Sequence, residues 1–366
     1  MSNRCERSSE RATFECTMRS AEARFLPWLS SVGVEAVDVV ALRGDVSTRR
    51  YFRVSSSSSR AFKSAIVAVY PEAEAHEVAR FEVTTKLFEE AGLRVPRILA
   101  CSSKQGLMLL EDFGDSTLFD LKNRAWPQLA GYFEQAVAIQ TRLSAEPSGG
   151  FARANPPLDA KRLRLELTEA QSLFLDSPEL VRSAADRGLL DQTLDDLCAG
   201  LAAEPLVPSH RDFMARNLML PATETGLGVI DHQDACLAPR FYDLASLFND
   251  SIFPAHRDEE QILNEVFRDR SSEAAYRRCA VQRALKATAT FVKFAMLGSD
   301  SHLPLVLPTL ARAAHHLERV REGRRLPRSF YDRWRDANSI ALAVSQLLER
   351  DARLDSSAGH SRPQRR

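Results

Sequence analysis

The stretch HRDFMARN, residues 210–217, is the most informative part of this sequence. It places an Asp five residues before an Asn, in a segment of short loops between longer helical patterns. Phosphoryl transfer needs little covalent chemistry from a protein, but it needs a carboxylate that orients the attacking hydroxyl and oxygen ligands for a metal ion. We interpret Asp212 as a candidate catalytic base and Asn217 as a candidate Mg2+ ligand.

A second carboxylate follows the loop at the end of a predicted strand. GLGVID, residues 226–231, ends at Asp231, nineteen residues after Asp212, and we expect Asp231 to face the same metal ion as Asn217. The loop also resembles the catalytic loop of protein kinases, H-R-D-x-x-x-x-N. Its four fixed letters arise by chance in roughly one of a thousand sequences of this composition. The alternative is a buried His-Arg-Asp ion-pair cluster that stabilises a turn.

The composition narrows the classes of partner. The chain has 366 residues, and its 49 Lys plus Arg are balanced by 49 Asp plus Glu that are spread along its length. We therefore expect a small-molecule substrate and no nucleic-acid or membrane partner. Six scattered cysteines without a C-x-x-C pair indicate reduced thiols. Because no signal peptide and no apolar run of membrane length is visible, we expect a cytoplasmic protein. We expect it to be either a monomer or a weak dimer.

The chain is predicted to have an α+β fold with two lobes. Runs rich in β-branched and aromatic residues flank one helical pattern, which gives the order β-β-β-α-β-β over residues 37–113. Helical patterns dominate from residue 126 to residue 350. We therefore predict a small, mainly β, nucleotide-binding lobe at residues 19–113 and a large helical lobe at residues 114–350 that is catalytic and binds the substrate. The polar ends, residues 1–18 and 351–366, are predicted to be disordered.

The first predicted hairpin, LRGDVSTRRYFRV, is a candidate phosphate-binding flap. Gly44 would let the backbone approach phosphates closely, and Ser47 and Thr48 would add hydroxyl donors. Arg49 or Arg50 would add positive charge. The alternative is an ordinary Gly-Asp hairpin turn.

The end of the last predicted strand, LLEDFG, is a candidate adenine site. Backbone groups near Glu111 and Phe113 lie where the small lobe is expected to meet the helical lobe, although an ordinary strand end and turn would look the same. Asp112-Phe113-Gly114 also spells the metal-binding triplet of protein kinases. It ends 98 residues before Asp212, whereas that triplet follows the catalytic loop, so we reject Asp112 as a metal ligand.

The third predicted strand lacks a residue that a kinase lobe normally carries. AIVAVYPE contains no lysine, and Tyr70 occupies the position expected for the lysine that grips nucleotide phosphates. Glu77 and Glu82 lie on the following helix, where such a lysine would find its partner. Whether either glutamate contributes to nucleotide binding or is only a solvated helix residue stays open.

Several segments together indicate a narrower resemblance. The chain resembles the aminoglycoside phosphotransferase-like kinases over most of its length, in GDVSTRRYFR, GLRVPRIL, LLEDFGDSTL, HRDFMARNLML, VIDHQDACLAPRFYDLASLFND and QRALKATATFVKF. GDVSTRRYFR and IDHQDA look most similar to the bacterial anomeric kinases of N-acetylmuramate and N-acetylglucosamine, a subgroup that tends to lack the third-strand lysine. The resemblance implies a bilobal protein-kinase-like fold, ATP and Mg2+ as cofactors, and phosphorylation of the anomeric hydroxyl of the sugar in cell-wall recycling.

The resemblance also assigns roles to single residues. Asp212 matches the catalytic base, and Asn217 and Asp231 match the metal ligands. Asp243 in YDLASL matches a buried aspartate that braces the catalytic loop, and His210 is interpreted as a second structural brace. The candidate acceptor contacts are Arg216, Gln233 and Asp234.

Departures from the family pattern leave the acceptor open. The family often has Phe where this chain has His232, and Gly-Pro where it has Ala238-Pro239, and both positions flank the expected acceptor site. One rival function is a kinase for another small hydroxyl compound, such as an aminoglycoside, choline or homoserine. An acidic acceptor pocket would favour the cationic members of that group. The other rival is a nucleotide-binding pseudokinase, which the missing lysine suggests and the intact loop residues oppose.

Overall fold

The computed structural model describes residues 20–42, 49–56, 62–221, 226–251, 259–267 and 269–357. Three sets of residues for which we made predictions lie outside these ranges. They are residues 1–18, the flap residues Gly44, Ser47 and Thr48, and residues 358–366 of the tail. The chain divides into two compact units. We call Met1–Leu118 with Asn217–Ala235 the N-terminal unit, and Phe119–Arg216 with Cys236–Arg366 the helical unit.

A five-stranded antiparallel sheet with the strand order β1-β2-β3-β5-β4 forms most of the N-terminal unit. The predicted order β-β-β-α-β-β is confirmed, because one α-helix, α2 (Glu77–Glu90), lies between the third and fourth strands. The strands are β1 (Asp38–Leu42), β2 (Arg50–Ser55), β3 (Ser64–Val69), β4 (Ile98–Ser102) and β5 (Leu107–Glu111), and a short helix η1 (Glu72–Glu74) follows β3.

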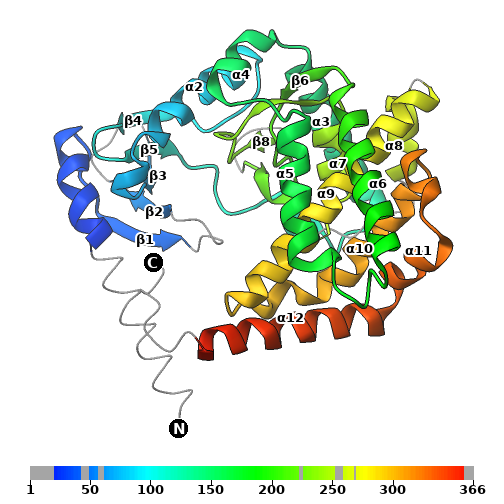
Figure 1. Ribbon diagram of the computed structural model, residues 1–366. Helices are drawn as coiled ribbons and strands as arrows, with labels where there is room; N and C mark the ends of the chain where they lie inside the picture. Colours follow the sequence, from blue (N-terminus) through cyan, green and yellow to red (C-terminus); the bar gives the residue numbers. More distant parts are fainter. Residues whose placement is uncertain are drawn as a thin grey trace. The chain divides into compact units, whose positions relative to one another are not determined.

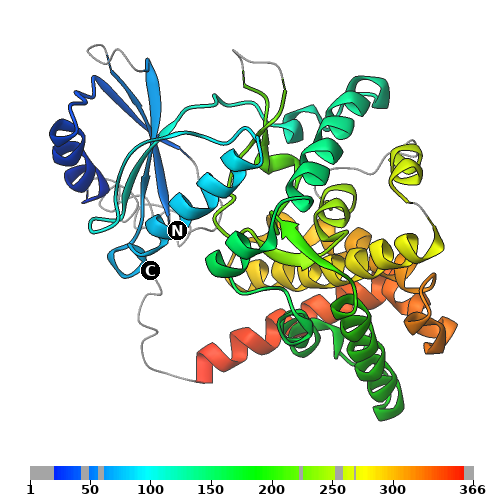
Figure 2. The same cartoon turned by 90° about the horizontal axis from the view of Figure 1, so that it is seen from above.

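Alternating side chains on these strands build a core on each face of the sheet. Val67 of β3 packs with Phe25 and Trp28 of the helix at residues 20–31, whereas Ala68 packs with Phe81 of α2. Successive strand residues point to opposite faces, so a strand that is apolar at every position needs a cover on both sides. The helix at residues 20–31 and α2 lie on opposite sides of the sheet and provide these covers (Figure 2).

A late segment of the chain joins this sheet unit. β7 (Leu218–Met219) and β8 (Gly228–Val229) form a small antiparallel pair. The N–H of Val229 donates to the carbonyl of Arg94 at 2.7 Å, and the N–H of Leu220 donates to the carbonyl of Ser116 at 2.8 Å. Residues 217–235 therefore group with the N-terminal unit, although the sequence suggested a single passage between lobes near residue 113.

The helical unit contains ten α-helices among its described residues. Several begin where a side chain caps the first turn: Asp159, Ser183 and Asp269 accept the N–H of Arg162, Asp186 and Ser272. The helices are α3 (Trp126–Ser144), α4 (Ser148–Ala154), α5 (Ala160–Ala170), α6 (Ala184–Ala202), α7 (Tyr242–Phe248), α8 (Glu259–Val266), α9 (Arg270–Met296), α10 (Val306–Leu317), α11 (Arg328–Arg335) and α12 (Ala337–Ser357).

Shorter elements connect these helices. β6 (Leu206–Ser209) pairs with β9 (Cys236–Pro239). The short helical turns are η2 (Leu118–Leu121), η3 (Gln171–Leu175), η4 (Ala215–Asn217), η5 (Asp300–Leu305) and η6 (Glu322–Arg325). α12 continues to Ser357, beyond residue 350, where we expected the helical lobe to end.

α9 is the central helix of its unit. It packs against α5, α6, α7 and α10 (Figure 1). Small and apolar residues are buried along most of its length, which lets neighbouring helices approach closely. The polar residues that α9 carries toward its neighbours are therefore confined to a few positions, and these positions form part of the site described below.

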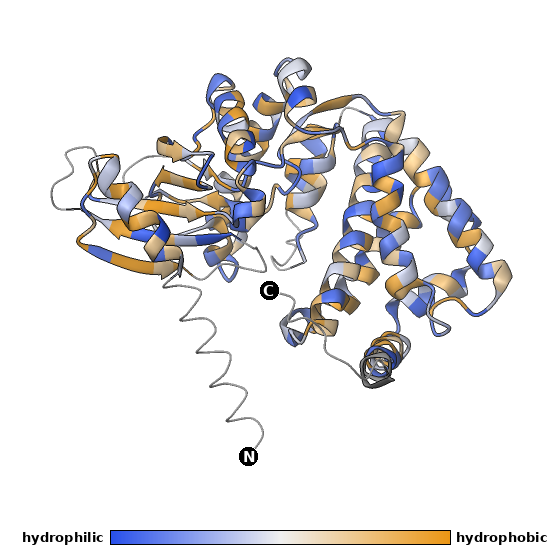
Figure 3. Cartoon of the chain, turned by 60° about the vertical axis from the view of Figure 1, so that its left-hand side comes forward, coloured by the Kyte–Doolittle hydropathy of each residue, from blue (hydrophilic) through white to orange (hydrophobic). Residues whose placement is uncertain are grey.

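Hydrophobic and hydrophilic residues alternate along the helices rather than forming long apolar runs (Figure 3). Within the described residues, no helix is both long enough and apolar enough to cross a membrane. The described cysteines, Cys101, Cys198, Cys236 and Cys279, are free thiols.

Candidate active site

The loop that carries Asp212 is held by the first turn of α7. The carboxylate of Asp243 accepts the backbone N–H of His210 at 2.7 Å and that of Arg211 at 2.9 Å. Arg211 has a φ of 79°, a left-handed conformation that costs free energy in a residue with a side chain. The two hydrogen bonds from the loop to Asp243 therefore hold a strained backbone immediately before Asp212.

His210 and Asp243 are both fully buried. The ring of His210 lies 5.9 Å from the ring of Phe213, so its side chain packs inside the loop. Burial raises the pKa of Asp243, and the two backbone N–H donors and the nearby His210 act in the opposite direction. These contacts are those of residues that shape the loop.

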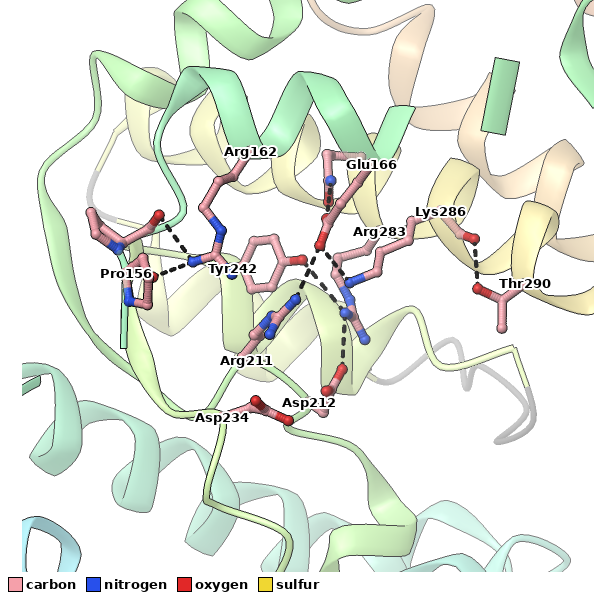
Figure 4. Close-up of polar contacts among 12 residues, drawn as sticks. Pro156, Arg162, Glu166, Arg211, Asp212, Asp234, Tyr242, Arg283, Lys286 and Thr290 are labelled. Carbon is pink, nitrogen blue, oxygen red and sulfur yellow. Dashed lines mark hydrogen bonds and ion pairs between the residues drawn. The ribbon is translucent and has the colours of Figure 1, made fainter. Parts of the chain in front are cut away.

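Asp212 lies beside a guanidinium group from α9. Arg283 contacts a carboxylate oxygen of Asp212 at 3.2 Å (Figure 4). It also donates to the hydroxyl of Ser246 at 2.9 Å. Burial opposes the charge of Asp212, but Arg283, Lys286 and Arg211 outweigh this effect and lower its pKa from 3.8 to about 2. Asp212 is therefore a carboxylate at neutral pH.

A second carboxylate, Glu166 of α5, gathers three donors behind Asp212. It accepts from Lys286 at 2.8 Å, from Gln282 at 2.8 Å and from Arg211 at 3.3 Å (Figure 4). Burial raises the pKa of Glu166, but Lys286 and the other donors outweigh it, so the pKa is lowered overall. Glu166 thereby ties α5, α9 and the loop together.

A cavity of about 180 Å³ opens next to Asp212, and all its lining residues belong to the helical unit. The lining combines charged, hydroxyl, amide and aromatic side chains, among them Asp212, Ser246, Asn249, Arg283, Lys286 and Phe291. Asp250 adds a second carboxylate. A hydroxyl compound in this cavity would have hydrogen-bond partners on its polar edges and an apolar face against Phe291.

The predicted metal ligands lie on adjoining backbone segments of the N-terminal unit. The N–H of Ile230 donates to the carbonyl of Asn217 at 3.0 Å, next to the β7–β8 pair, and Asp231 follows directly. Asp231 has a φ of 61°, a left-handed conformation, and its side chain is 38% exposed. Strained backbone conformations of this kind cluster at functional sites.

These donors fit a magnesium ion. Carboxylate and amide oxygens suit a hard cation, and Mg2+ is usually held by one or two carboxylates together with water and phosphate oxygens. Among the described residues there is no group of three or more His, Cys, Asp or Glu side chains that would hold a metal ion by itself. Asn217 and Asp231 offer two oxygen donors, which suits an ion that keeps further ligands of its own.

Asp231 also contacts a cation from the strand edge. Arg49, directly before β2, lies 3.2 Å from a carboxylate oxygen of Asp231, and Gln233 donates to the same oxygen at 2.9 Å. The guanidinium of Arg49 lies 5.9 Å from the ring centre of Tyr70. The described part of the predicted flap is thus close to the predicted metal ligand.

The predicted adenine site is built on ion pairs. Glu111 accepts from Arg94 at 2.6 Å and 2.9 Å and from Arg97 at 3.1 Å, and the hydrogen bonds from Arg94 are the main cause that lowers its pKa to about 2. Its N–H already donates to the carbonyl of Arg97 at 2.9 Å, so an adenine would have to displace this bond. The ring of Phe113 is buried and lies 4.4 Å from the guanidinium of Arg94.

Asp112, which we rejected as a metal ligand, has structural partners. It accepts from Arg53 at 2.7 Å and 3.0 Å and from the N–H of Gly114 at 2.9 Å. The side chain of Asp112 is only 5% exposed. It therefore ties β2 to the turn that follows β5.

The remaining acceptor candidates have neighbours of their own. Gln233 lies 3.5 Å from Asp234, and Asp234 lies 3.8 Å from Arg80. In the helical unit, the guanidinium of Arg216 lies over the ring of Phe119 at 4.8 Å, and Arg216 does not line the cavity beside Asp212.

The two helix glutamates have partners in the same unit. Glu77 pairs with Arg80 at 2.9 Å, and Glu82 accepts from the thiol of Cys101 at 3.0 Å. Glu82 thus contacts β4. Neither of these two contacts involves Arg49, the cation of the predicted flap.

His232 occupies an aromatic site on α2. Its ring is fully buried, 4.6 Å from the ring of Phe81 and 5.1 Å from that of Phe88. Its Nε2 lies 2.8 Å from the hydroxyl of Thr85. A ring that the family often supplies as Phe is thus accommodated here with one additional hydrogen bond.

Sequence reasoning missed Glu166, Arg283 and Lys286. Arg283 and Lys286 stand three residues apart in QRALK, so they share one helix face, and this spacing was a usable signal. Glu166 gave no comparable signal, because its partners lie 45 to 120 residues away along the chain.

Known proteins resemble this chain in sequence and in fold. Residues 38–282 match the model of the phosphotransferase enzyme family, APH. An N-acetylmuramate/N-acetylglucosamine kinase of Neisseria meningitidis serogroup B is 31% identical over 246 residues, which cover 66% of this chain and 70% of that protein. A kinase of the same name from Pseudomonas aeruginosa is 32% identical over 219 residues, covering 60% of this chain and 61% of that protein.

Among solved structures, a choline/ethanolamine kinase family protein from Mesorhizobium loti has a similar fold. The TM-score is 0.57 at 16% identity, over 86% of this chain and 99% of that one. This similarity concerns the fold alone.

Proposed function

The chain belongs to the phosphotransferase enzyme family, and we propose that it transfers the γ-phosphate of ATP to the anomeric hydroxyl of an N-acetylhexosamine. The proposed acceptors are N-acetylmuramate and N-acetylglucosamine, which appear in the names of relatives at 31% and 32% identity. The product is a sugar 1-phosphate of the kind that cell-wall recycling would use.

The position of Asp212 in the wall of a small cavity that combines polar and apolar side chains carries this proposal. The cavity measures about 180 Å³. Sites for drug-sized ligands measure about 300–1,000 Å³, so this cavity suits one sugar ring better than a multi-ring aminoglycoside. The hydroxyl of Ser246 offers a hydrogen bond to a sugar hydroxyl, and Phe291 offers an apolar face.

In the proposed reaction, Asp212 orients the anomeric hydroxyl and accepts its proton while the hydroxyl oxygen attacks the γ-phosphorus. The bond between the γ-phosphorus and the bridging oxygen breaks as the new O–P bond forms, and ADP leaves with the electron pair. Because the pKa of Asp212 is about 2, it is ionised and ready to accept a hydrogen bond at neutral pH. A base this weak acts mainly by orienting the nucleophile.

Asn217 and Asp231 are the proposed ligands of the nucleotide-bound Mg2+, which supplies charge neutralisation on the phosphates. Both residues provide oxygen donors next to the β7–β8 pair, and Arg49 adds a positive charge beside Asp231. Chain connectivity supports their cooperation with the base, since Asn217 is the fifth residue after Asp212, which limits their Cα atoms to about 18 Å apart.

A coupled assay of ADP release across N-acetylmuramate, N-acetylglucosamine and related hexosamines tests the proposal. We expect release to require both a sugar and a divalent cation, to stop on chelation, and to fall at least a thousandfold in Asp212→Asn. Asp195→Asn is the matched control, because that carboxylate is 62% exposed on α6. Turnover of none of the sugars would refute the substrate assignment, and undiminished turnover in Asp212→Asn would refute the base.

The identity of the product tests the phosphorylated hydroxyl. A phosphate on the anomeric oxygen prevents ring opening, so the product should no longer react as a reducing sugar. Phosphorus NMR should show one phosphate coupled to the anomeric proton. A product that stays reducing would show that another hydroxyl is phosphorylated.

The charge of the cavity disfavours the cationic acceptors among the rival functions. Choline and aminoglycosides need an acidic pocket, but the two lining carboxylates, Asp212 and Asp250, are balanced by Arg283 and Lys286. Calorimetry with choline and one aminoglycoside should therefore show no binding at concentrations that saturate the sugar.

A further inference from the structure

Positive charge is concentrated on one wall of the cavity beside Asp212. Arg283 and Lys286 lie three residues apart on α9, so they project from one face of this helix, and both line the cavity. Asp212 and Asp250 also line it, so the cavity is neutral by formal charge. The cations are therefore suited to contacting one particular group of a ligand rather than to attracting anions in general.

The two cations differ in how their charge is used. Arg283 contacts Asp212 at 3.2 Å and donates to Ser246 at 2.9 Å. Its guanidinium group is therefore bonded to the loop and to α7. Lys286 donates to Glu166 at 2.8 Å, but Glu166 also accepts from Gln282 and Arg211 (Figure 4). Lys286 thus shares one carboxylate with two other donors.

Lys286 can bind a further anion without leaving its place. An ammonium group has three donors, and its side chain remains 26% exposed while it contacts Glu166. Burial and the neighbouring Arg283 lower the pKa of Lys286, and the carboxylates of Glu166 and Asp212 act in the opposite direction. An incoming carboxylate would add a further negative charge beside the ammonium group and favour its charged form.

We propose that Lys286, with Arg283 beside it, binds a carboxylate of the acceptor, so that the enzyme prefers an acidic N-acetylhexosamine to its neutral counterpart. This inference rests on the proposed function. Of the two proposed acceptors, N-acetylmuramate carries a carboxylate on its lactyl ether, whereas N-acetylglucosamine has a hydroxyl at that position. A charge-assisted hydrogen bond from Lys286 to this carboxylate would distinguish the two sugars.

The same cations have a competing role, because they are also suited to binding the phosphoryl group during transfer. In that role Lys286 would matter equally for both sugars. The ratio of kcat/KM for N-acetylmuramate to kcat/KM for N-acetylglucosamine therefore separates the two roles.

The first experiment changes the ligand and leaves the protein intact. The wild-type enzyme is assayed with N-acetylmuramate, with its methyl ester and with N-acetylglucosamine. We expect the free acid to have a kcat/KM about tenfold or more above the ester, as the loss of a hydrogen bond to a charged group predicts. Equal values for acid and ester, or a preference for the neutral sugar, would overturn the proposal.

The second experiment removes the ammonium group. In Lys286→Gln the ratio of the two kcat/KM values should fall about tenfold, and Lys286→Arg should keep most of it. Lys293→Gln on the same helix is the control, because Lys293 is exposed and pairs only with Glu169 among the described residues. An equal loss on both sugars would overturn the carboxylate site in favour of phosphoryl binding.

The outcomes also separate this inference from the proposed function. Turnover of neither sugar by the wild type refutes the proposed function. Turnover of both sugars with an unchanged ratio in Lys286→Gln refutes only the carboxylate site. If Lys286→Gln does not fold, as circular dichroism would show, the comparison of acid and ester decides.

Discussion

The guanidinium of Arg49 lies 3.2 Å from a carboxylate oxygen of Asp231. Arg50 pairs with Val69 in the antiparallel β2–β3 ladder, so Arg49 and Tyr70 occupy the next opposing positions. Tyr70 stands where a kinase lysine is expected. A cation from the neighbouring strand therefore reaches the predicted metal ligand, and this arrangement offers an explanation for the absence of a lysine from β3.

Removal of Arg49 should weaken nucleotide binding more than acceptor binding. Hydrogen bonds to charged groups contribute about 1.5–3 kcal/mol, so we expect Arg49→Ala to raise the KM for ATP about tenfold or more. Arg49→Lys should recover part of the loss. Steady-state kinetics with each substrate varied in turn, and calorimetry of ATP binding, measure the effect. Lys86→Ala, with a side chain 76% exposed, is the control, and an unchanged KM for ATP in Arg49→Ala would contradict this role.

The environment of Asp212 should set the acid limit of the proposed activity. Its pKa is about 2, below its ordinary 3.8, so its charge contributes stability above about pH 4 that is lost as the pH falls toward 2. Arg283 is the leading cause of the lowering, and burial acts against it. In Arg283→Gln the pKa of Asp212 should rise, and the acid limb of kcat/KM should move to higher pH.

This shift is measured from kcat/KM profiles over the pH range in which both proteins stay folded. Arg278→Gln is a control on the same helix, because Arg278 pairs with Glu204 and Glu322 rather than with Asp212. Superimposable acid limbs for wild type and Arg283→Gln would show that Arg283 does not set the charge of Asp212.

The parts that could be predicted from sequence are those with local patterns. The β-branched and aromatic runs indicated strands, and the order β-β-β-α-β-β along the chain followed from them. That Val67 and Ala68 pack on opposite faces of the sheet became clear only in the structure. The letters of HRDFMARN indicated Asp212 and Asn217 as candidate site residues, and their roles stay a prediction.

The parts that could not be predicted depend on contacts between distant segments. Glu166 and Lys286 are 120 residues apart, and no local period links α5 to α9. The grouping of residues 217–235 with the sheet likewise depends on hydrogen bonds such as that from Val229 to Arg94. The cavity wall is built by side chains that have several partners on separate helices. A single sequence contains little local pattern that would predict such contacts.

Asp243 should be essential for the stability of the loop. Its carboxylate accepts two buried N–H groups, and leaving each of these unsatisfied costs about 1–3 kcal/mol. We expect Asp243→Ala to lower the free energy of unfolding by about 2–5 kcal/mol, and Asp243→Asn to lower it less, because the amide keeps one acceptor oxygen. Urea unfolding measures this order. Asp195→Ala should change stability by less than about 0.5 kcal/mol, and a similar small change in Asp243→Ala would disprove the bracing role.

The close packing at Gly228 should not tolerate a methyl group. A Cβ at this position would lie 2.5 Å from Cε2 of Phe113, so Gly228→Ala must displace that ring. Overpacking of this kind costs about 1–3 kcal/mol. Gly188→Ala in α6 meets nothing within 4 Å and should stabilise by about 0.5–1 kcal/mol, since alanine favours a helix. Thermal unfolding compares the two, and a neutral Gly228→Ala would mean that Phe113 can move freely.

The contact between Thr85 and His232 should behave as a coupled pair. Their 2.8 Å hydrogen bond is buried next to Phe81 and Phe88, and Asp231 immediately precedes His232. Thr85→Val and His232→Phe each remove one partner and should each cost about 1–3 kcal/mol, the cost of a buried polar group that loses its bond. The double variant replaces both partners by apolar groups of similar shape, so it should recover most of the loss.

A double-mutant cycle in urea measures this coupling, and the Mg2+ concentration that gives half-maximal turnover provides a second measurement. Because His232 anchors the backbone next to Asp231 to α2, Thr85→Val should raise that Mg2+ concentration, and the double variant should bring it back toward the wild-type value. If the two single costs simply add, the hydrogen bond is not coupled. If stability recovers in the double variant but the Mg2+ requirement does not, the histidine itself, rather than its packing, positions the metal ligand.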